Sequence, residues 1–157
     1  MSYSTRFVLG LYYDQTVELG GDWACQYIAN HPIVRFISVD NLKRGKPDHP
    51  TSVLVHSTVP FGLANAHRAH EDVAPELLAA VRELVPALPH TEDRKSLKWL
   101  YSQVHRGLPG TPGSVTLSSS PALVVGGDAF TQSNFDGCVK SAKSITESVT
   151  NSVSQQQ

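Results

Sequence analysis

The sequence predicts an α+β fold, in which an antiparallel sheet with a covering helix precedes a strand–helix piece. Three observations support this prediction. Three β-rich runs follow one another between residues 6 and 56 with no helical pattern between them. Apolar residues at helical spacing begin near residue 72. A short apolar run ends at Gly126-Gly127 and precedes a second helical pattern. Runs of strands followed by helices are typical of α+β proteins.

The β-rich runs predict the sheet. Residues 6–13 (RFVLGLYY), 34–39 (VRFISV) and 52–56 (SVLVH) are rich in β-branched, aromatic and other apolar residues. Residues 40–50 (DNLKRGKPDHP) contain the Gly, Pro and Asp typical of a loop. Because consecutive strands lack a helical crossover, we expect antiparallel pairing.

A first amphipathic helix is expected after these strands. Its apolar residues recur at spacings of four, four and three, and they are Val73, Leu77, Val81 and Leu84. Asp72 is a candidate cap, Pro75 falls in the expected first turn, and Pro86 lies beyond the end. Residues 97–104 (LKWLYSQV) then predict another strand.

The last third predicts a strand and a second amphipathic helix. Residues 122–125 (ALVV) form the short apolar run expected of a strand buried on both faces. In a parallel sheet such a strand needs partners, so we expect an unpaired edge in this chain. The helix is predicted by apolar residues at spacings of four, three, three and four: Phe135, Val139, Ala142, Ile145 and Val149. Residues 152–157 are polar and are expected to form a disordered tail.

Composition argues against several partners. The formal net charge is −1, with 13 basic and 14 acidic residues, so no electrostatic footprint for nucleic acid or an anionic membrane is expected. No apolar stretch has the length of a signal-peptide core or a membrane span. As written, the chain is expected to be cytoplasmic, an expectation that depends on Met1 being the natural start.

The segment from Gly126 to Asn134 is the candidate site. Two glycines at a strand end let a ligand approach closely, and the carboxylate of Asp128 can accept hydrogen bonds from sugar or polyol hydroxyls. A helix start near Asn134 offers free N–H groups and a partial positive charge. The alternative is a tight strand-to-helix turn, in which Asp128 or Asn134 is a plain cap.

Beyond these local features, residues 126–142 (GGDAFTQSNFDGCVKSA) closely resemble the C-terminal flavin motif of the renalase family of amine-oxidase-type flavoproteins. Other segments resemble successive renalase segments in the same order. They are residues 2–13 (SYSTRFVLGLYY), 26–41 (QYIANHPIVRFISVDN), 53–62 (VLVHSTVPFG), 85–89 (VPALP) and 98–104 (KWLYSQV). The resemblance therefore spans nearly the whole chain.

The resemblance implies an FAD-dependent oxidoreductase with a Rossmann-like FAD domain and a sheet-bearing substrate domain. Such enzymes oxidise isomeric dihydro forms of NAD(P) to NAD(P)⁺ and pass the electrons to oxygen as hydrogen peroxide. The expected partners are thus a small dihydronicotinamide substrate and oxygen. No serine nucleophile or metal cluster is required, because the flavin performs the redox chemistry.

The resemblance also implies site residues. Those expected to lie against FAD are Gly127, Asp128, Asn134, Phe135, Asp136 and Gly137. His56 and Trp99 fall where the family places its substrate pocket over the flavin ring, and Arg35 is a candidate for a phosphate or sugar. By residue type alone, Trp99 could equally be core and His56 a structural histidine. Relatives often carry Arg where this chain has Leu100.

No G-x-G-x-x-G turn for the FAD pyrophosphate occurs in the sequence. We therefore expect residues 1–113 to form a partial substrate-binding domain and residues 114–151 to be the C-terminal segment of an FAD domain. The chain is then expected to be a fragment without the N-terminal half of the parent enzyme. The alternatives are a non-catalytic remnant that binds a partner, and an amine oxidase on the same scaffold.

Overall fold

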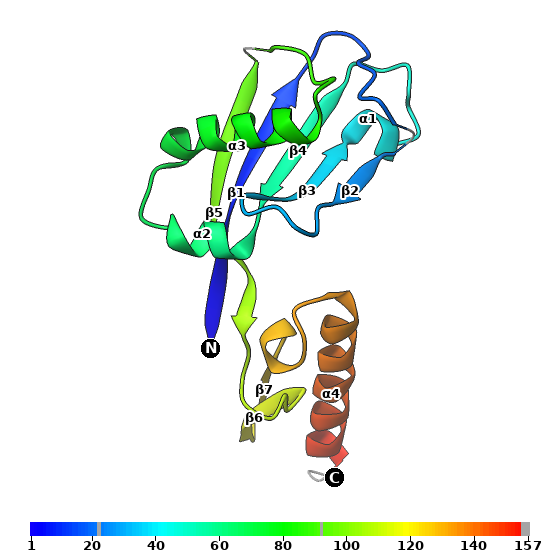
Figure 1. Cartoon of the computed structure of the whole chain (residues 1–157). Coiled ribbons are helices and arrows are strands. Elements are labelled where there is room, and N and C mark those ends of the chain that lie inside the picture. The colour runs from blue at the N-terminus through cyan, green and yellow to red at the C-terminus, as the bar shows by residue number, and fades with distance from the viewer. Residues whose placement is uncertain (22, 92, 155–157) are drawn as a thin grey trace. The chain divides into compact units, whose positions relative to one another are not determined.

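A computed structural model describes residues 1–21, 23–91 and 93–154. The chain divides into two compact units. Unit 1 contains Met1–Ser4 and the chain from Tyr101 onward, and unit 2 contains Thr5–Leu100. Two long strands contribute residues to both units: β1 (Ser2–Tyr12) and β5 (Arg94–Arg106) (Figure 1).

Unit 2 is built on a five-stranded sheet of order β2-β3-β4-β1-β5. The remaining strands are β2 (Cys25–Tyr27), β3 (Val34–Val39) and β4 (Ser52–Ser57). Strand β1 pairs with β4, β4 with β3, and β3 with β2, all antiparallel. The predicted antiparallel sheet is therefore confirmed. The three-residue β2 was not predicted.

One face of this sheet is covered by α3 (His70–Leu84), which crosses the strands in Figure 1. The core residues from the strands include Phe7, Leu9, Leu11, Ile37, Val53 and Val55. The helix contributes Val73, Leu77, Leu78, Ala80 and Val81. Fully burying each large apolar side chain stabilises the fold by about 1.5–3 kcal/mol. The apolar spacing that predicted the helix thus identified its packing face.

The start of α3 differs from the prediction. The helix begins at His70, so Asp72 lies in its first turn, and Ala69 is the cap without a side-chain hydrogen bond. Pro75 therefore lies inside the helix, beyond its first turn, rather than in the first turn as predicted. A carboxylate in the first turn still interacts favourably with the helix dipole, which explains an acidic residue there.

Two short helices were not predicted. α1 (Asp40–Lys43) interrupts the predicted loop after β3, and α2 (Val59–Ala64) follows β4. Thr58 caps α2, because its side-chain oxygen accepts a hydrogen bond from the backbone N–H of Phe61. Gly62 packs so closely on β1 that a Cβ there would overlap the carbonyl oxygen of Thr5.

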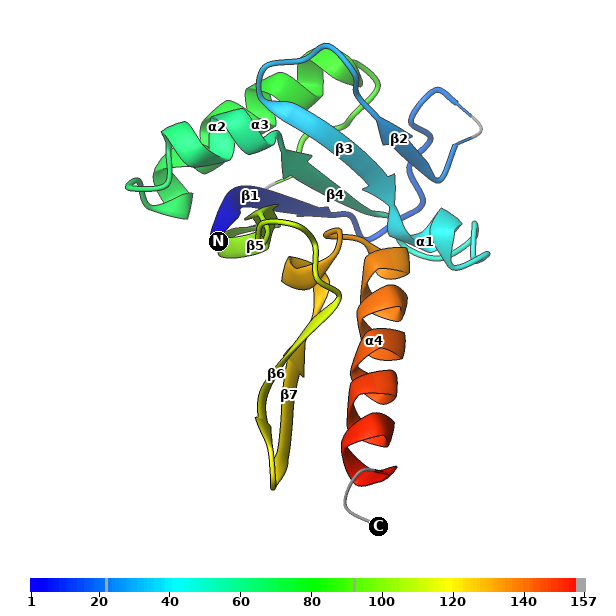
Figure 2. The same cartoon turned by 90° about the horizontal axis from the view of Figure 1, so that it is seen from below.

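Unit 1 contains a β-hairpin and a long helix, which lie side by side in Figure 2. Its elements are β6 (Ser114–Ser119), β7 (Ala122–Gly126), the 3-10 turn η1 (Asp128–Phe130) and α4 (Phe135–Ser154). β7 pairs antiparallel with β6. The expectation of a strand buried on both faces is thus wrong, because Leu123 is 52% exposed. β6 occupies one edge of β7, and among the described residues the other edge of this two-stranded sheet has no partner strand, as expected.

Helix α4 packs on the hairpin through serines and through Ile145, which lies against Gly126. Ser141 is buried, and the hydroxyl of Ser144 lies 2.7 Å from that of Ser114. The predicted apolar side is largely exposed, with Phe135 at 81% and Val139 at 40%. The prediction of the helix is confirmed, but its apolar side has no cover within unit 1.

The compact units divide between Leu100 and Tyr101, inside β5. The division into a substrate-binding segment and an FAD-domain segment after residue 113 stays a prediction. Residues 152–154 of the predicted tail belong to α4, and residues 155–157 lie outside the described part of the chain. Among the described residues, no helix combines the length and the apolar character needed to cross a membrane.

Candidate functional site

Four aromatic rings from four strands form a row across one face of the unit 2 sheet. We call Tyr27, Phe36, His56 and Trp99 the aromatic row. Ring centroids lie 4.9 Å apart for Tyr27 and Phe36, 5.6 Å for Phe36 and His56, and 5.3 Å for His56 and Trp99. Tilted or edge-to-face contacts at these distances are favourable for aromatic pairs. The structure thus brings His56 and Trp99 into contact, two residues far apart in the sequence that the resemblance assigns to one substrate pocket.

Strand alternation explains why these rings share a face. Val53 and Val55 of β4 point into the core beneath α3, so the next residue, His56, turns its side chain to the opposite face. On β5, Lys98 donates to the carbonyl oxygens of Ala66 and Arg68 at the helix-covered side. Trp99 therefore projects to the same face as His56, and it remains 43% exposed. The aromatic row is an open surface rather than core.

The imidazole of His56 is electrostatically disfavoured as a cation. Burial, followed by the positive charges of Arg6 and Lys43, lowers the pKa of His56 below its ordinary value. The ring is therefore neutral at pH 7, with one nitrogen as donor and one as acceptor. Such a group can hydrogen-bond an amide or a hydroxyl.

The lowered pKa of His56 makes a prediction about stability. Below the ordinary histidine value of about 6.5, the unfolded chain takes up a proton that folded His56 resists, so stability falls as the pH falls. We expect His56→Gln to show a shallower fall between about pH 6.5 and pH 5 in urea unfolding. The matched control is His67→Gln, at an exposed position. A wild-type slope in the His56 variant would contradict the prediction.

Arg35 reaches the outer end of the aromatic row through a bulge. The β3–β4 register shifts between Val34 and Phe36, which leaves Arg35 as an extra residue. Its guanidinium carbon lies 5.5 Å from the centroid of the Tyr27 ring, and Nη1 donates to the carbonyl oxygen of Ile28 at 3.2 Å. Regular alternation along β3 would have put the side chains of Arg35 and Phe36 on opposite faces of the sheet, whereas the bulge lets Arg35 reach the face that carries Phe36.

Arg6 was not nominated from the sequence. It precedes the core residue Phe7 on β1, so alternation turns its side chain away from the core. Burial, followed by the charge of Arg35, lowers the pKa of Arg6, while Tyr27 acts in the opposite direction. The arginine therefore lies within electrostatic reach of both Arg35 and His56.

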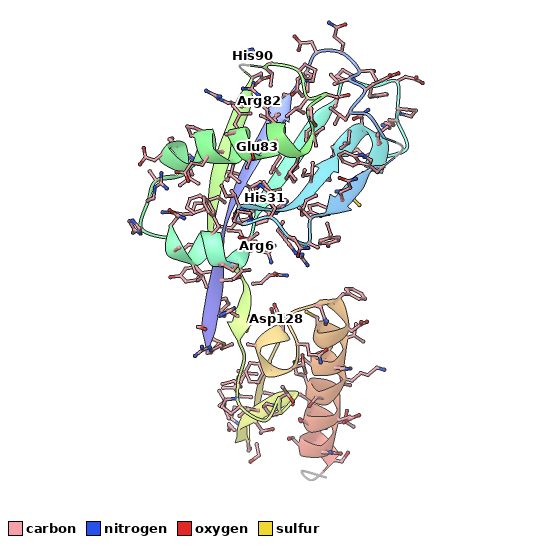
Figure 3. All side chains as sticks on the ribbon, in the orientation of Figure 1. Arg6, His31, Arg82, Glu83, His90 and Asp128 are labelled. Atoms are coloured by element: carbon pink, nitrogen blue, oxygen red, sulfur yellow. The ribbon has the colours of Figure 1, made fainter. Side chains whose placement is uncertain are left out.

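A pocket of about 480 Å³ opens beside these arginines. Figure 3 labels Arg6 and His31, two of the residues that line it. The remaining lining residues are Ile28, Ala29, Pro32, Arg35, Thr58, Val59 and Pro60. The pocket thus combines two guanidinium groups with an apolar wall.

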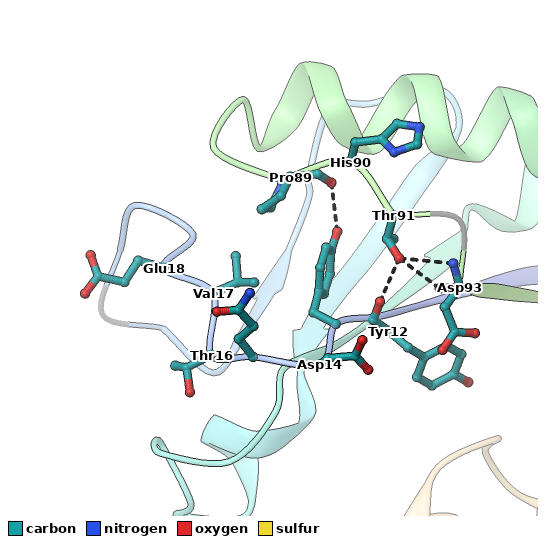
Figure 4. Close-up of a pocket in the computed structure, with 11 residues that line it drawn as sticks. Tyr12, Asp14, Thr16, Val17, Glu18, Pro89, His90, Thr91 and Asp93 are labelled. Carbon is teal, nitrogen blue, oxygen red and sulfur yellow. Dashed lines mark hydrogen bonds between the residues drawn. The ribbon is translucent and has the colours of Figure 1, made fainter.

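A second pocket of unit 2, about 580 Å³, lies between the segment after β1 and the segment before β5 (Figure 4). Its internal hydrogen bonds hold those two segments together. The Tyr13 hydroxyl donates to the carbonyl oxygen of Pro89 at 3.1 Å, and Thr91 donates to that of Tyr12 at 2.8 Å. None of the nominated site residues lines this pocket.

In unit 1, the Gly-Gly-Asp turn is open at Gly127, whereas a Cβ at Gly126 would overlap the side chains of Ser141 and Ile145. Gly127 has a φ of 138°, which favours glycine, and a Cβ there would meet nothing within 4 Å. The Asp128 Oδ2 accepts a hydrogen bond from Ser133 at 2.9 Å. Among the described residues, no partner is found for Oδ1. One carboxylate oxygen is therefore held and the other is free to accept.

The start of α4 is a capped helix terminus. The Oδ1 of Asn134 accepts from the backbone N–H of Gly137 at 2.8 Å, so Asn134 is the N-cap. Gly137 is buried, and a Cβ there would overlap the carbonyl oxygen of Gln132. The backbone N–H groups of Phe135 and Asp136 have no acceptor within the helix. At this helix terminus, the backbone N–H groups available to a ligand thus belong to Phe135 and Asp136, while Gly137 packs against Gln132.

Ser141 holds the turn in place and was not nominated from the sequence. Its hydroxyl donates to the carbonyl oxygen of Gly113 at 2.6 Å and accepts from the backbone N–H of Gly127 at 2.7 Å. A second hydrogen bond near the turn is donated by the Thr131 hydroxyl to the carbonyl oxygen of Gly137, at 2.7 Å. A small hydroxyl on a helix's inner face is a weak sequence signal, because serine is common on exposed faces too.

His70, at the start of α3, has a structural role. Its ring lies 2.8 Å from the Ser96 hydroxyl, a contact that joins α3 to β5, and 3.2 Å from a carboxylate oxygen of Glu71 on the same helix.

No protein-family model matches the chain. A search of curated proteins finds similarity to renalase from Mus musculus, at 40% identity over 147 residues. The match covers 92% of this chain and 43% of the mouse protein. The chain thus spans less than half the length of this relative. The resemblance predicted from scattered segments is confirmed: over most of its length, the chain is similar to renalase.

Proposed function

We propose that the chain is part of a renalase-like, FAD-dependent oxidoreductase that oxidises isomeric dihydro forms of NAD(P) to NAD(P)⁺, with oxygen reduced to hydrogen peroxide. The observation that carries this proposal is the 40% identity to renalase along nearly the whole chain. The geometry of each unit is consistent with one half of the task. Unit 1 would bind flavin, and unit 2 would bind the dihydronicotinamide.

The residues of unit 1 fit FAD in three respects. Gly127 leaves open space beside the backbone, and the free Oδ1 of Asp128 can accept from a ribityl hydroxyl. The first-turn N–H groups of Phe135 and Asp136 can donate to a carbonyl group. The carboxylate of Asp136 lies in that same turn, which offsets part of the positive potential there.

The residues of unit 2 fit a dihydronicotinamide. Trp99 offers an apolar plane for a flat ring, and it is held edge-on by His56 at 5.3 Å. The neutral His56 can donate to, or accept from, the carboxamide or a ribose hydroxyl. Bound FAD would supply the acceptor for the hydride, while these side chains bind and orient the substrate.

The uncovered side of α4 supports a further part of the proposal, a Rossmann-like FAD domain to which unit 1 contributes. Large apolar side chains of unit 1 that are more than a third exposed include Leu117, Leu123, Phe135, Val139, Val149 and Val153. Such a concentration of apolar surface is unusual for a finished domain and is typical of a surface that packs on another element. Additional strands and helices of an FAD domain would cover it.

Two preparations test the proposed function. In the first, the 157-residue chain is purified and mixed with FAD. In the second, called here the extended protein, the chain is joined to the part of mouse renalase that the match does not cover. We expect the extended protein to retain flavin absorbance after dialysis and to lose it when dihydronicotinamide isomers are added without oxygen. Bleaching by a primary amine alone would favour an amine oxidase, and failure of both proteins to hold flavin would favour a non-catalytic remnant.

Asp128→Ala is expected to weaken flavin retention in the extended protein. The change removes the carboxylate that would accept from the ribityl chain, and a hydrogen bond to a charged group is worth about 1.5–3 kcal/mol. We therefore expect flavin affinity to fall by about 10-fold or more. Glu147→Ala, an exposed carboxylate on the same helix, is the control. Equal flavin occupancy in the two variants after dialysis would argue against this role for Asp128.

A further inference from the structure

We infer that the pocket beside Arg6 and Arg35 binds a phosphate group of a nucleotide. This inference rests on the proposed function, because it names a part of the substrate that the aromatic row does not bind. The pocket lies within unit 2 and has a volume of about 480 Å³. That volume is in the range of sites for small organic ligands, which is about 300–1,000 Å³.

The charge of the pocket favours an anion. Arg6 and Arg35 both line it, and no carboxylate is among its described lining residues. The two guanidinium groups repel each other, as the influence of Arg35 on the Arg6 pKa shows. Planar guanidinium groups bind phosphate oxygens in a bidentate geometry, and arginine side chains remain charged across the physiological pH range.

A histidine supplies a further donor to this pocket. The Nδ1 of His31 accepts from the backbone N–H groups of Ile33 at 3.1 Å and Val34 at 2.9 Å. Because Nδ1 is an acceptor, the neutral ring carries its proton on Nε2. His31 is therefore held in the tautomer whose outer nitrogen donates, which suits an anionic oxygen.

The rest of the lining indicates more than an inorganic ion. Ile28, Pro32, Val59 and Pro60 form an apolar wall that free phosphate would leave unused. Arg35 also lies over the ring of Tyr27, so the pocket adjoins the aromatic row. A ligand with a flat ring, a sugar and a phosphate would use the row, the wall and the arginines together. Those features describe a nucleotide.

The test compares two probes that differ only by one phosphate. Nicotinamide mononucleotide and nicotinamide riboside are titrated into the 157-residue chain by calorimetry. We expect the mononucleotide to bind about 10-fold or more tightly than the riboside, as hydrogen bonds to charged groups predict. In Arg35→Gln, the tighter binding of the mononucleotide over the riboside should largely disappear. In Arg35→Lys, the difference should be intermediate, because a single ammonium group replaces the bidentate guanidinium group.

The controls separate binding from folding. Arg35 is exposed, so its substitution should leave the thermal midpoint near that of the wild type, and Arg94→Gln provides the same change away from the pocket. Equal affinity for both probes, or a phosphate preference that survives in Arg35→Gln, would overturn the inference. So would binding of inorganic pyrophosphate without binding of the mononucleotide. Calorimetry needs no flavin, so failure of the proposed redox function would be seen separately.

Discussion

Gly137→Ala is expected to lower the free energy of unfolding of α4 and its hairpin by about 2–4 kcal/mol. The added Cβ would overlap the carbonyl oxygen of Gln132, and its next neighbours would also be backbone atoms of that residue. Backbone cannot rotate aside as a side chain can. The helix start must therefore shift, and the 2.8 Å hydrogen bond from the Gly137 N–H to Asn134 is weakened at the same time.

Hydrogen exchange followed by mass spectrometry measures this effect one segment at a time. We expect faster exchange across the first turns of α4 in Gly137→Ala, while the unit 2 sheet keeps its protection. Lys140→Ala, at an exposed position of the same helix, should exchange as the wild type does. Wild-type protection in Gly137→Ala would show that the turn before α4 can yield, and that Gly137 is not required for packing.

The same geometry limits what Gly137 can do in a flavin site. A buried glycine held against Gln132 contributes close packing, whereas the neighbouring Phe135 and Asp136 are exposed. If Gly137→Ala also loses flavin in the extended protein, the loss would follow from the displaced helix start. Asp128→Ala should lose flavin without faster exchange in α4, which distinguishes a contact from a support.

Much of unit 2 could be predicted from the sequence because its elements follow simple periods. Strand β3 has the predicted bounds, and α3 buries the residues that recur at helical spacing. The core lies between these elements, so local pattern and tertiary packing agree. Strand β2 escaped prediction because its three residues are all exposed, and exposed residues leave no apolar period.

Unit 1 was harder to predict because the face of α4 that packs on the hairpin is mostly polar. The apolar stripe of α4 correctly predicted a helix, but periodicity does not say which neighbour covers a stripe. Here the inner face carries Ser141, Ser144 and Ser148, which hydrogen-bond to the hairpin or to its preceding loop. The pairing of β7 with β6 was missed because residues 114–119 are rich in Ser and Thr and read as a solvent-exposed segment.

The candidate site was predictable only in part. Alternation along β4 and β5 puts His56 and Trp99 on a common face, but their 5.3 Å contact depends on strand order, which the sequence does not specify. The bulge at Arg35 brings it over Tyr27, and bulges have no reliable sequence signal. Arg6 was overlooked since a single charged residue in a strand usually lies in solvent.

Trp99→Ala in the extended protein is expected to slow flavin reduction by a dihydronicotinamide isomer by about 100-fold, the usual cost of losing substrate position. Trp99 is 43% exposed on the open face of the sheet, so its indole is available to a ligand and carries little of the core. The proposed role is to hold the ring flat, which Phe would partly preserve. Stopped-flow measurement without oxygen isolates this step.

The comparison that decides the role of Trp99 is between reduction rate and flavin content. Trp99 lies in unit 2 and the proposed flavin contacts lie in unit 1, so Trp99→Ala should leave bound flavin unchanged. Leu100→Ala, whose side chain alternates to the other side of β5, is the matched control and should react as the wild type does. Trp99→Phe should recover part of the rate. An unaltered rate in Trp99→Ala would remove the aromatic row from the substrate site, and with it the link between unit 2 and the redox reaction.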